Sequence, residues 1–317
     1  MDVPETLRII VTAFAFAIGA VVGSFLNVVI WRVPRGESIV APPSHCPGCN
    51  ERLAWYHNIP LVSWIVLRGR CAYCRTRISP RYPLVELITG LLAVACVTVF
   101  GLSPVAVRTF VFVSLLVALT YIDLDHWLLP HGITWPGIVL GLGTAWLPGA
   151  PGLVPSLLGA GAGFAGFWIL RVVAERLLKK EAMGGGDLFL LAMIGAFLGW
   201  RALLPVVFLA SVQGSVIGAL ALALRHRAAG ASAGPPPETP PGTADAVPAE
   251  AAVTAVPSGP GGGEGETEAA TSAEDAEWTP PPGAVPFGPF LSLAALEMAF
   301  LGDWILTQIY RFVGLSA

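Results

Sequence analysis

The sequence predicts an all-α membrane protein with about eight transmembrane helices and a small polar insert after the first of them. Three observations support this prediction. Of the 317 residues, 55% are hydrophobic and only 12% are charged, with a mean hydropathy of +0.70. Soluble domains carry about 25% charged residues. Apolar runs recur along most of the chain, and a polar segment with four cysteines separates the first two.

Eight apolar runs are long enough to cross the hydrocarbon core of a membrane, which takes roughly 20 helical residues. The first run lacks the basic start and small-residue cleavage site of a signal peptide, so we expect it to be retained. The sixth and seventh are short and adjacent, which leaves open that one of them is tilted or partly interfacial. The runs are 8–31, 84–101, 104–122, 133–149, 153–172, 187–203, 204–224 and 288–313.

Lysine and arginine are distributed unevenly between the connecting loops. The chain has 18 Lys and Arg residues. With eight spans, only four of them lie on one side of the membrane, and these are Arg8, Arg108, Arg201 and Arg311. The others lie in the loops after the first, fifth and seventh runs. Because cytoplasmic loops are enriched in Lys and Arg, these three loops are expected in the cytoplasm and both termini outside it.

The polar insert, residues 32–83, has the cysteine spacing of a metal site. Two C-x2-C pairs are separated by 21 residues, and they consist of Cys46, Cys49, Cys71 and Cys74. Tetrahedral zinc takes four thiolates from two such pairs. Two disulfides are the alternative, but a cytoplasmic loop is kept reducing. The insert is therefore predicted to bind zinc, whereas Cys96, alone in an apolar run, is expected to be a small core or lipid-facing residue.

The segment 228–284 has a different composition from the rest of the chain. It is rich in Ala, Gly, Pro, Thr and Glu and contains no basic residue. Such a segment cannot bury enough apolar surface to fold, so a disordered cytoplasmic linker is expected. The predicted divisions are a first transmembrane helix (1–31), the insert (32–83), a transmembrane core of about six helices (84–224), an acidic linker (225–284) and a last helix (285–317).

Two aspartates lie at the edges of apolar runs on the same side of the membrane. Asp123 ends the third run, and Asp187 begins the sixth after three glycines. The fourth and fifth runs form a hairpin out and back, so both carboxyl groups are expected at one face. An ionisable group at such a position is a functional candidate, because keeping it there costs free energy. Two carboxyl groups that share a proton in a shielded site can perform acid/base hydrolysis.

Other polar residues have simpler interpretations. Asp187 alone could be a helix N-cap, although three preceding glycines favour close backbone approach to a ligand. On a helix, Asp125 faces about 200° away from Asp123, so only one of the two can line a site. Glu86 and Glu297 could pair with an arginine or a polar group inside the spans. His126 and His131 lie at the membrane interface. No third metal ligand is near them, so a second metal site is not expected.

Motifs spread over nearly the whole chain outside 228–284 follow one another in a specific order. The earlier ones are Gly23–Ile30 with Arg32 and Pro34, Ser44–Cys49, Trp55–Pro60, Arg68–Cys71 and Arg81–Glu86. The later ones are Ile122–His126 with Leu128–Pro130, Lys180–Asp187 and Pro286–Phe290. In type and order these motifs resemble those of the type IV prepilin peptidases, and the cysteines match the zinc-type subset of that family.

The resemblance implies a bifunctional enzyme of the bacterial inner membrane. It implies cleavage of the basic leader of type IV prepilins and pseudopilins after a glycine at the cytoplasmic face. It also implies N-methylation of the new N-terminus with S-adenosylmethionine. By resemblance, Asp123 and Asp187 are the catalytic pair and Asp125 is accessory. The chain departs from the family pattern at Phe189, where Lys is common, and at His131, where Asp is frequent.

Four alternatives use part of the same evidence. The chain could be a peptidase without methyltransferase activity, because no S-adenosylmethionine-binding fold is recognisable. A proton-coupled transporter would favour carboxylates near mid-membrane and a repeat between halves, and neither is evident. A zinc-stapled scaffold would not explain the paired aspartates. A presenilin-like protease shares only the G-x-G-D element. The arginines are explained by topology, so no nucleic-acid partner is expected, and the expected partners are prepilin substrates and membrane lipid.

Overall fold

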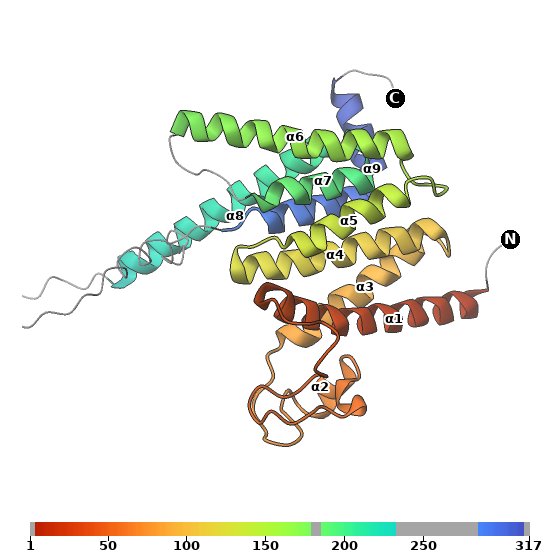
Figure 1. Ribbon diagram of the computed structural model, residues 1–317, viewed down its shortest axis with the longest axis vertical. Coiled ribbons are helices and arrows are strands. Elements are labelled where there is room, and N and C mark those ends of the chain that lie inside the picture. Colours follow the sequence, from red (N-terminus) through yellow and green to blue (C-terminus); the bar gives the residue numbers. More distant parts are fainter. Residues whose placement is uncertain (1–3, 179–184, 233–284, 314–317) are drawn as a thin grey trace, which may run out of the picture. The chain divides into compact units, whose positions relative to one another are not determined.

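The structure of the chain, a computed structural model, describes residues 4–178, 185–232 and 285–313. These residues are helical apart from loops and two isolated β-bridges in the insert, so the predicted all-α class is confirmed for them (Figure 1). The chain divides into two units, Met1–Ile217 with Val285–Ala317, and Gly218–Ala284. The residues that form the candidate site all belong to the first unit.

Each of the eight predicted apolar runs forms a helix. The insert contributes a short helix, α2 (Val62–Val66), and three 3₁₀ turns are present, η1 (Val33–Arg35), η2 (Trp55–Asn58) and η3 (Trp200–Ala202). The eight long helices are α1 (Glu5–Arg32), α3 (Arg81–Phe100), α4 (Pro104–His126), α5 (His131–Gly143), α6 (Leu153–Leu178), α7 (Gly186–Leu198), α8 (Leu203–Ser232) and α9 (Gly288–Val313).

Six of these helices are long and apolar enough to cross a membrane, and α5 and α7 are not. Each of the two has 13 residues, which corresponds to about 20 Å of helix against a hydrocarbon core of about 30 Å. Both end earlier than the apolar runs that predicted them. Gly199 takes a left-handed φ of 79° and ends α7 before Trp200, although the apolar run continues to residue 203.

The predicted linker boundary at residue 225 needs a correction. Helix α8 continues to Ser232, because the alanine-rich stretch after residue 225 still favours helix. The remainder of the predicted disordered linker, 233–284, lies outside the described residues.

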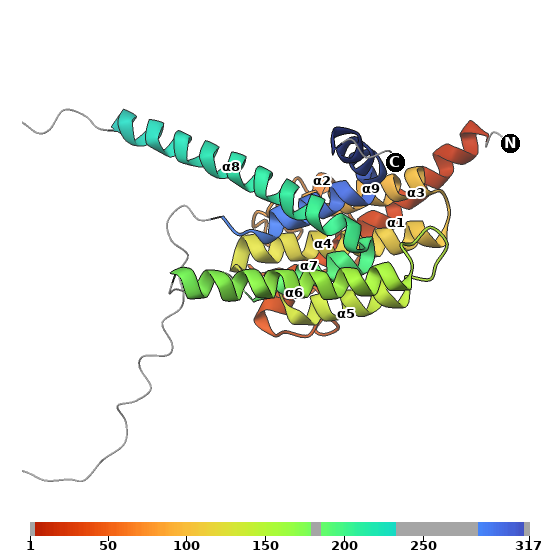
Figure 2. The same cartoon turned by 90° about the horizontal axis from the view of Figure 1, so that it is seen from above.

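Helix α7 lies inside the bundle rather than at its surface. Nine of its residues are buried, from Leu188 to Phe197. It packs against α5, α6 and α9, and Figures 1 and 2 show it surrounded by these helices. The approach to α6 is especially close at Gly159 and Gly195, where a Cβ on either residue would overlap the backbone of the other helix. Small residues allow such close packing of membrane helices.

Arg108, near the start of α4, holds the far ends of both short helices. Its side chain is 6% exposed. The guanidinium donates to the Thr144 hydroxyl over 3.0 Å, and to the carbonyls of Gly141 and Ala196 over 3.4 and 3.3 Å. These groups lie at the C-terminal ends of α5 and α7, where carbonyl oxygens lack helical partners and a cation is favoured. The cation also lies 4.8 Å above the centre of the Phe197 ring.

We predict that Arg108→Met lowers the free energy of unfolding by about 1–3 kcal/mol, because buried carbonyl groups lose their donors. Thermal unfolding of the detergent-purified protein measures this change. The matched control is Arg201→Met, since Arg201 is an exposed arginine on the turn that follows α7. Equal melting temperatures for Arg108→Met and the wild type would show that the contacts of Arg108 carry no stability.

Candidate active site

Asp123 and Asp187 come together at one end of the first unit. Asp123 lies in the last turn of α4 and is 5% exposed. Asp187 lies in the first turn of α7 and is half-buried. The charge of Asp123 acts on the Asp187 carboxyl group, so the two groups are near neighbours. Two carboxyl groups in this arrangement favour a state that shares one proton, because two full negative charges repel each other.

The start of α9 forms the third side of the site. The Gly288 backbone hydrogen-bonds to the Asp123 carboxyl group. A Cβ at Gly288 would overlap Asp123 Oδ2. The backbone therefore approaches the carboxyl group more closely than any residue with a side chain would allow. Free amide groups at the starts of α7 and α9 also favour negative charge there.

The turn between α4 and α5 brings a further side chain to the site. Trp127 adopts a left-handed conformation (φ 53°), and its amide donates to the Asp123 carbonyl over 2.9 Å. This turn directs Leu129, 6% exposed, into the bundle. A Cβ at Gly186 would lie 2.7 Å from Leu129 Cβ, and one at Gly288 would lie 3.4 Å from Leu129 Cδ1. Leu129 thus packs against the residues beside both aspartates.

The structure separates the other acidic residues from this pair. Asp125 is exposed and forms an ion pair with Arg81 at the start of α3. It lies away from the pair, as its position on the opposite face of the helix predicts. Glu297 accepts two hydrogen bonds of 2.9 Å from the Gln213 side chain. Glu86 is buried and accepts a hydrogen bond from the Leu61 amide. Each therefore has a partner of its own away from the Asp123–Asp187 pair.

His131 and Phe189, the two residues at which the chain departs from the family pattern, are in contact with each other. The rings of His131 and Phe189 meet edge to face with centroids 4.5 Å apart. Phe189 also contacts Trp135 and Phe164, with centroids 5.6 and 5.4 Å apart. An aromatic cluster therefore lies two residues from Asp187. Nothing local in the sequence indicates that residue 131 lies beside residue 189.

The sequence alone gives no role to Gly288, although this residue lies within the Pro286–Phe290 motif. The available signal was a glycine followed by proline at the start of an apolar helix, where the glycine can serve close backbone approach. Only the three-dimensional structure shows that the group approached is Asp123.

The four cysteines of the insert also come together. Their sulfur atoms all lie within 4.8 Å of one another, and all four are free rather than paired in disulfides. Sγ of Cys46 lies 3.7 Å from Sγ of Cys74. A tetrahedral zinc site with Zn–S bonds of about 2.3 Å has sulfur–sulfur edges of about 3.8 Å. The cluster therefore fits a tetrahedral metal ion, which the four thiolates would hold.

Each pair of cysteines is built as the same knuckle. The amides of Gly48 and Tyr73 each point at the sulfur of the preceding cysteine over 3.4 Å. Asn50 and Arg75 take left-handed conformations at the equivalent position. Amide donors stabilise thiolates, and hydrogen bonding to Thr76 lowers the pKa of Cys74 to about 6. The repeated geometry favours a structural metal site, since the two knuckles bring four sulfur atoms within 4.8 Å of one another.

Polar residues at the ends of α1 and α3 connect the insert to the helices. Asn27 donates to the Tyr82 carbonyl over 3.1 Å. Arg32, 7% exposed, donates to the carbonyls of Ser38 and Pro42 over 2.9 and 2.7 Å. These contacts explain why polar side chains occur at the edge of the first apolar run, and they indicate a structural role for both residues.

Comparison with known proteins agrees with the motifs. Residues 17–100 match the bacterial peptidase A24 N-terminal domain, and residues 110–219 match the type IV leader peptidase family. A prepilin leader peptidase/N-methyltransferase from Myxococcus xanthus is 45% identical over 311 residues, covering 92% of this chain and 90% of the relative. One of the same name from Xanthomonas campestris is 37% identical, covering 67% and 82%.

A third relative, from Escherichia coli, is named a type 4 prepilin-like proteins leader peptide-processing enzyme. It is 38% identical over 221 residues, covering 62% of this chain and 81% of the relative. No solved structure is significantly similar to the chain. The extent and level of identity to these relatives show that the chain belongs to the type IV leader peptidase family.

We predict that Gly288→Ala lowers leader-peptide cleavage about 100-fold, because a shift of about 1 Å in a catalytic group costs a factor of this size. The added Cβ would displace the Asp123 carboxyl group. Cleavage is measured on a model substrate with purified protein. The control is Gly161→Ala on α6, where a Cβ would meet no atom within 4 Å. If both variants cleave at the wild-type rate, the close approach of α9 to Asp123 has no part in the reaction.

Proposed function

We propose that this chain is an aspartyl endopeptidase that removes the basic leader of type IV prepilins and pseudopilins and then methylates the new N-terminus. The observation that carries the peptidase assignment is the meeting of Asp123 and Asp187 at the ends of α4 and α7. The names of the relatives support both the substrate class and the second activity. A transporter is less well supported, because both carboxyl groups lie at helix ends rather than at mid-span.

The proposed hydrolysis uses the two carboxyl groups in opposite protonation states. The ionised one takes a proton from a water molecule as the oxygen attacks the scissile carbonyl carbon. The protonated one donates its proton to the carbonyl oxygen. Collapse of the tetrahedral intermediate breaks the C–N bond, and the leaving amine takes up a proton from the pair. The lack of side chains at Gly186 and Gly288 lets the backbone pack closely against Leu129 and the Asp123 carboxyl group.

Methylation requires S-adenosylmethionine, which supplies a methyl group to the amine released by cleavage. The two reactions use different chemistry, since hydrolysis needs water and the aspartates, whereas methyl transfer needs a bound donor. Within this proposal the donor lies near the insert and α1, because the amine is released at that face. His131 and Phe189 lie close to Asp187 and are candidates for setting the shape of the substrate path.

We predict that Asp123→Asn or Asp187→Asn lowers prepilin cleavage by about 100- to 10,000-fold, the usual contribution of acid/base catalysis. Asp125→Asn is the matched control, because Asp125 pairs with Arg81 instead. Mass spectrometry of the pilin N-terminus reads both steps, and pre-cleaved pilin should still be methylated by the aspartate variants. Wild-type cleavage by Asp187→Asn contradicts the peptidase mechanism, while cleaved but unmethylated product from the wild type contradicts only the second activity.

We infer that the metal of the insert is zinc, held by Cys46, Cys49, Cys71 and Cys74. The purified protein should contain about one zinc ion per chain, since four thiolates complete a structural zinc site. The double variant Cys46→Ser with Cys71→Ser should contain none, whereas Cys96→Ser should keep its zinc because Cys96 is buried in α3. Elemental analysis distinguishes these outcomes, and zinc retained in full by the double variant rules out the assignment.

We also infer that the aspartates and the insert face the cytoplasm of the bacterial cell. The distribution of Lys and Arg supports this orientation. A cysteine placed at Thr6, which is exposed at the start of α1, should then react with a membrane-impermeant maleimide in intact spheroplasts. The unsubstituted protein gives the background. Labelling of Thr6→Cys only after lysis would reverse the orientation.

A further inference from the structure

Helix α2 of the insert carries an apolar face that no other described element covers. Val62, Ile65 and Val66 are 53%, 67% and 71% exposed. Just before them, Trp55 and Tyr56 are 79% and 53% exposed. A folded soluble domain seldom exposes so many large apolar side chains together. Trp and Tyr next to aliphatic side chains are typical of segments at a membrane interface.

A hydrogen bond sets the depth of α2 relative to the membrane-spanning helices. The Leu61 amide, immediately before α2, donates to Glu86 Oε2 over 2.8 Å. Glu86 lies five residues, or about 8 Å, inside the start of α3. Figures 1 and 2 show the insert alongside the end of α1 rather than beyond it. Because α3 is a candidate span, its first turns and the exposed face of α2 lie at the same level.

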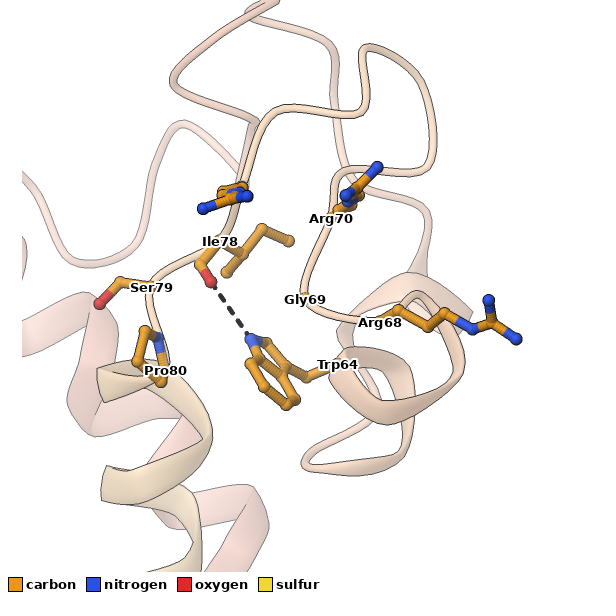
Figure 3. Close-up of a pocket in the computed structure, with 8 residues that line it drawn as sticks. Trp64, Arg68, Gly69, Arg70, Ile78, Ser79 and Pro80 are labelled. Carbon is orange, nitrogen blue, oxygen red and sulfur yellow. Dashed lines mark hydrogen bonds between the residues drawn. The ribbon is translucent and has the colours of Figure 1, made fainter.

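A cavity of about 500 Å³ lies between α2, the second knuckle and the start of α3. Trp64 and Pro80 line it, as Figure 3 shows, and the Trp64 indole donates to the Ile78 carbonyl over 3.3 Å. The remaining contributors include three exposed arginines, Arg68, Arg70 and Arg77. In Figure 3 the Arg68 side chain extends outward, away from Trp64.

Two of these arginines oppose each other directly. Arg70 and Arg77 form an antiparallel bridge, and directly opposed residues project their side chains to the same face about 5 Å apart. Like charges in this position repel. Neither arginine forms an ion pair with any residue that the structure describes. The two guanidinium groups can therefore bind an anion, and exposed apolar side chains border the site.

We propose that α2 and the adjacent arginine-lined cavity form a docking surface for anionic phospholipid. The side chains of Val62, Ile65 and Val66 enter the interfacial layer, and Arg70 and Arg77 bind the phosphate of a lipid headgroup. The cavity is not expected to bind a basic leader peptide, because its arginines would repel the positive charges of the leader. The depth of α2 and its exposed apolar face decide against a soluble acidic partner.

Titration of the full-length protein in detergent tests the headgroup site. The probes are dioctanoyl-phosphatidylglycerol, the phosphatidylcholine of equal chain length, and inorganic phosphate. The wild type should prefer the anionic lipid, and the double variant Arg70→Gln with Arg77→Gln should bind it about 30-fold more weakly, at about fivefold per arginine. Phosphate alone should bind far more weakly, since it lacks the apolar contacts.

Arg52→Gln is the matched control, because Arg52 occupies the bridge of the first knuckle, where His45 opposes it. It should bind the anionic lipid as the wild type does, and all variants should keep their metal. Equal loss in Arg52→Gln and the double variant would overturn the proposal, as would equal affinity of the wild type for both lipids. Phosphate binding as tight as that of the anionic lipid would assign the cavity to a free anion instead.

A second measurement tests the depth of α2 independently of the arginines. A bimane label at Val66→Cys, in nanodiscs containing phosphatidylglycerol, should be quenched by nitroxide lipids and protected from iodide. Quenching by iodide alone would place α2 in water. Protection from both quenchers would mean that protein, such as a second copy of this chain, covers the face. Either result would overturn the proposal.

Discussion

The rest of the structure depends on how α7 is held. This helix is too short to reach both faces of a membrane, so packing must set its depth. Close contact between Gly159 and Gly195 fixes it against α6, and Arg108 of α4 binds the carbonyl of Ala196 near its C-terminal end. Helix α4 also carries Asp123, so the helix that contacts the C-terminal end of α7 supplies one of the two aspartates. Asp187, in the first turn of α7, is thereby brought to Asp123 by a rigid frame rather than by a loop.

The site illustrates how a membrane protein can keep two carboxyl groups together. Burial of charge is costly, and the cost is lowered when backbone amides face the group. Here the starts of α7 and α9 both point toward the pair, and the Gly288 backbone contacts Asp123 without an intervening side chain. The insert folds separately from this site. It contains two matching cysteine knuckles, and Asn27, Arg32 and Glu86 connect it to the helices. This separation leaves the insert free to have a function of its own at the membrane surface.

Much of this arrangement could be predicted from the sequence, because the relevant signals are local. Long apolar runs predict helices, paired cysteines predict a metal site, and aspartates at run edges predict functional groups. The rest depends on contacts between distant residues. Gly199 ends α7 early through its backbone conformation, although the apolar run continues. The partnership of Gly288 with Asp123, and the contact of His131 with Phe189, arise only when the helices pack.

Disulfide cross-linking tests the meeting of the two aspartates most directly. In a Cys96→Ser background, the double variant Asp123→Cys with Asp187→Cys should form an intramolecular disulfide under mild oxidation. Asp125→Cys with Asp187→Cys should not, because Asp125 faces Arg81 on the opposite side of α4. Mass spectrometry of the linked peptides distinguishes the pairs. A disulfide in the Asp125 pair and none in the Asp123 pair would contradict the structure of the site.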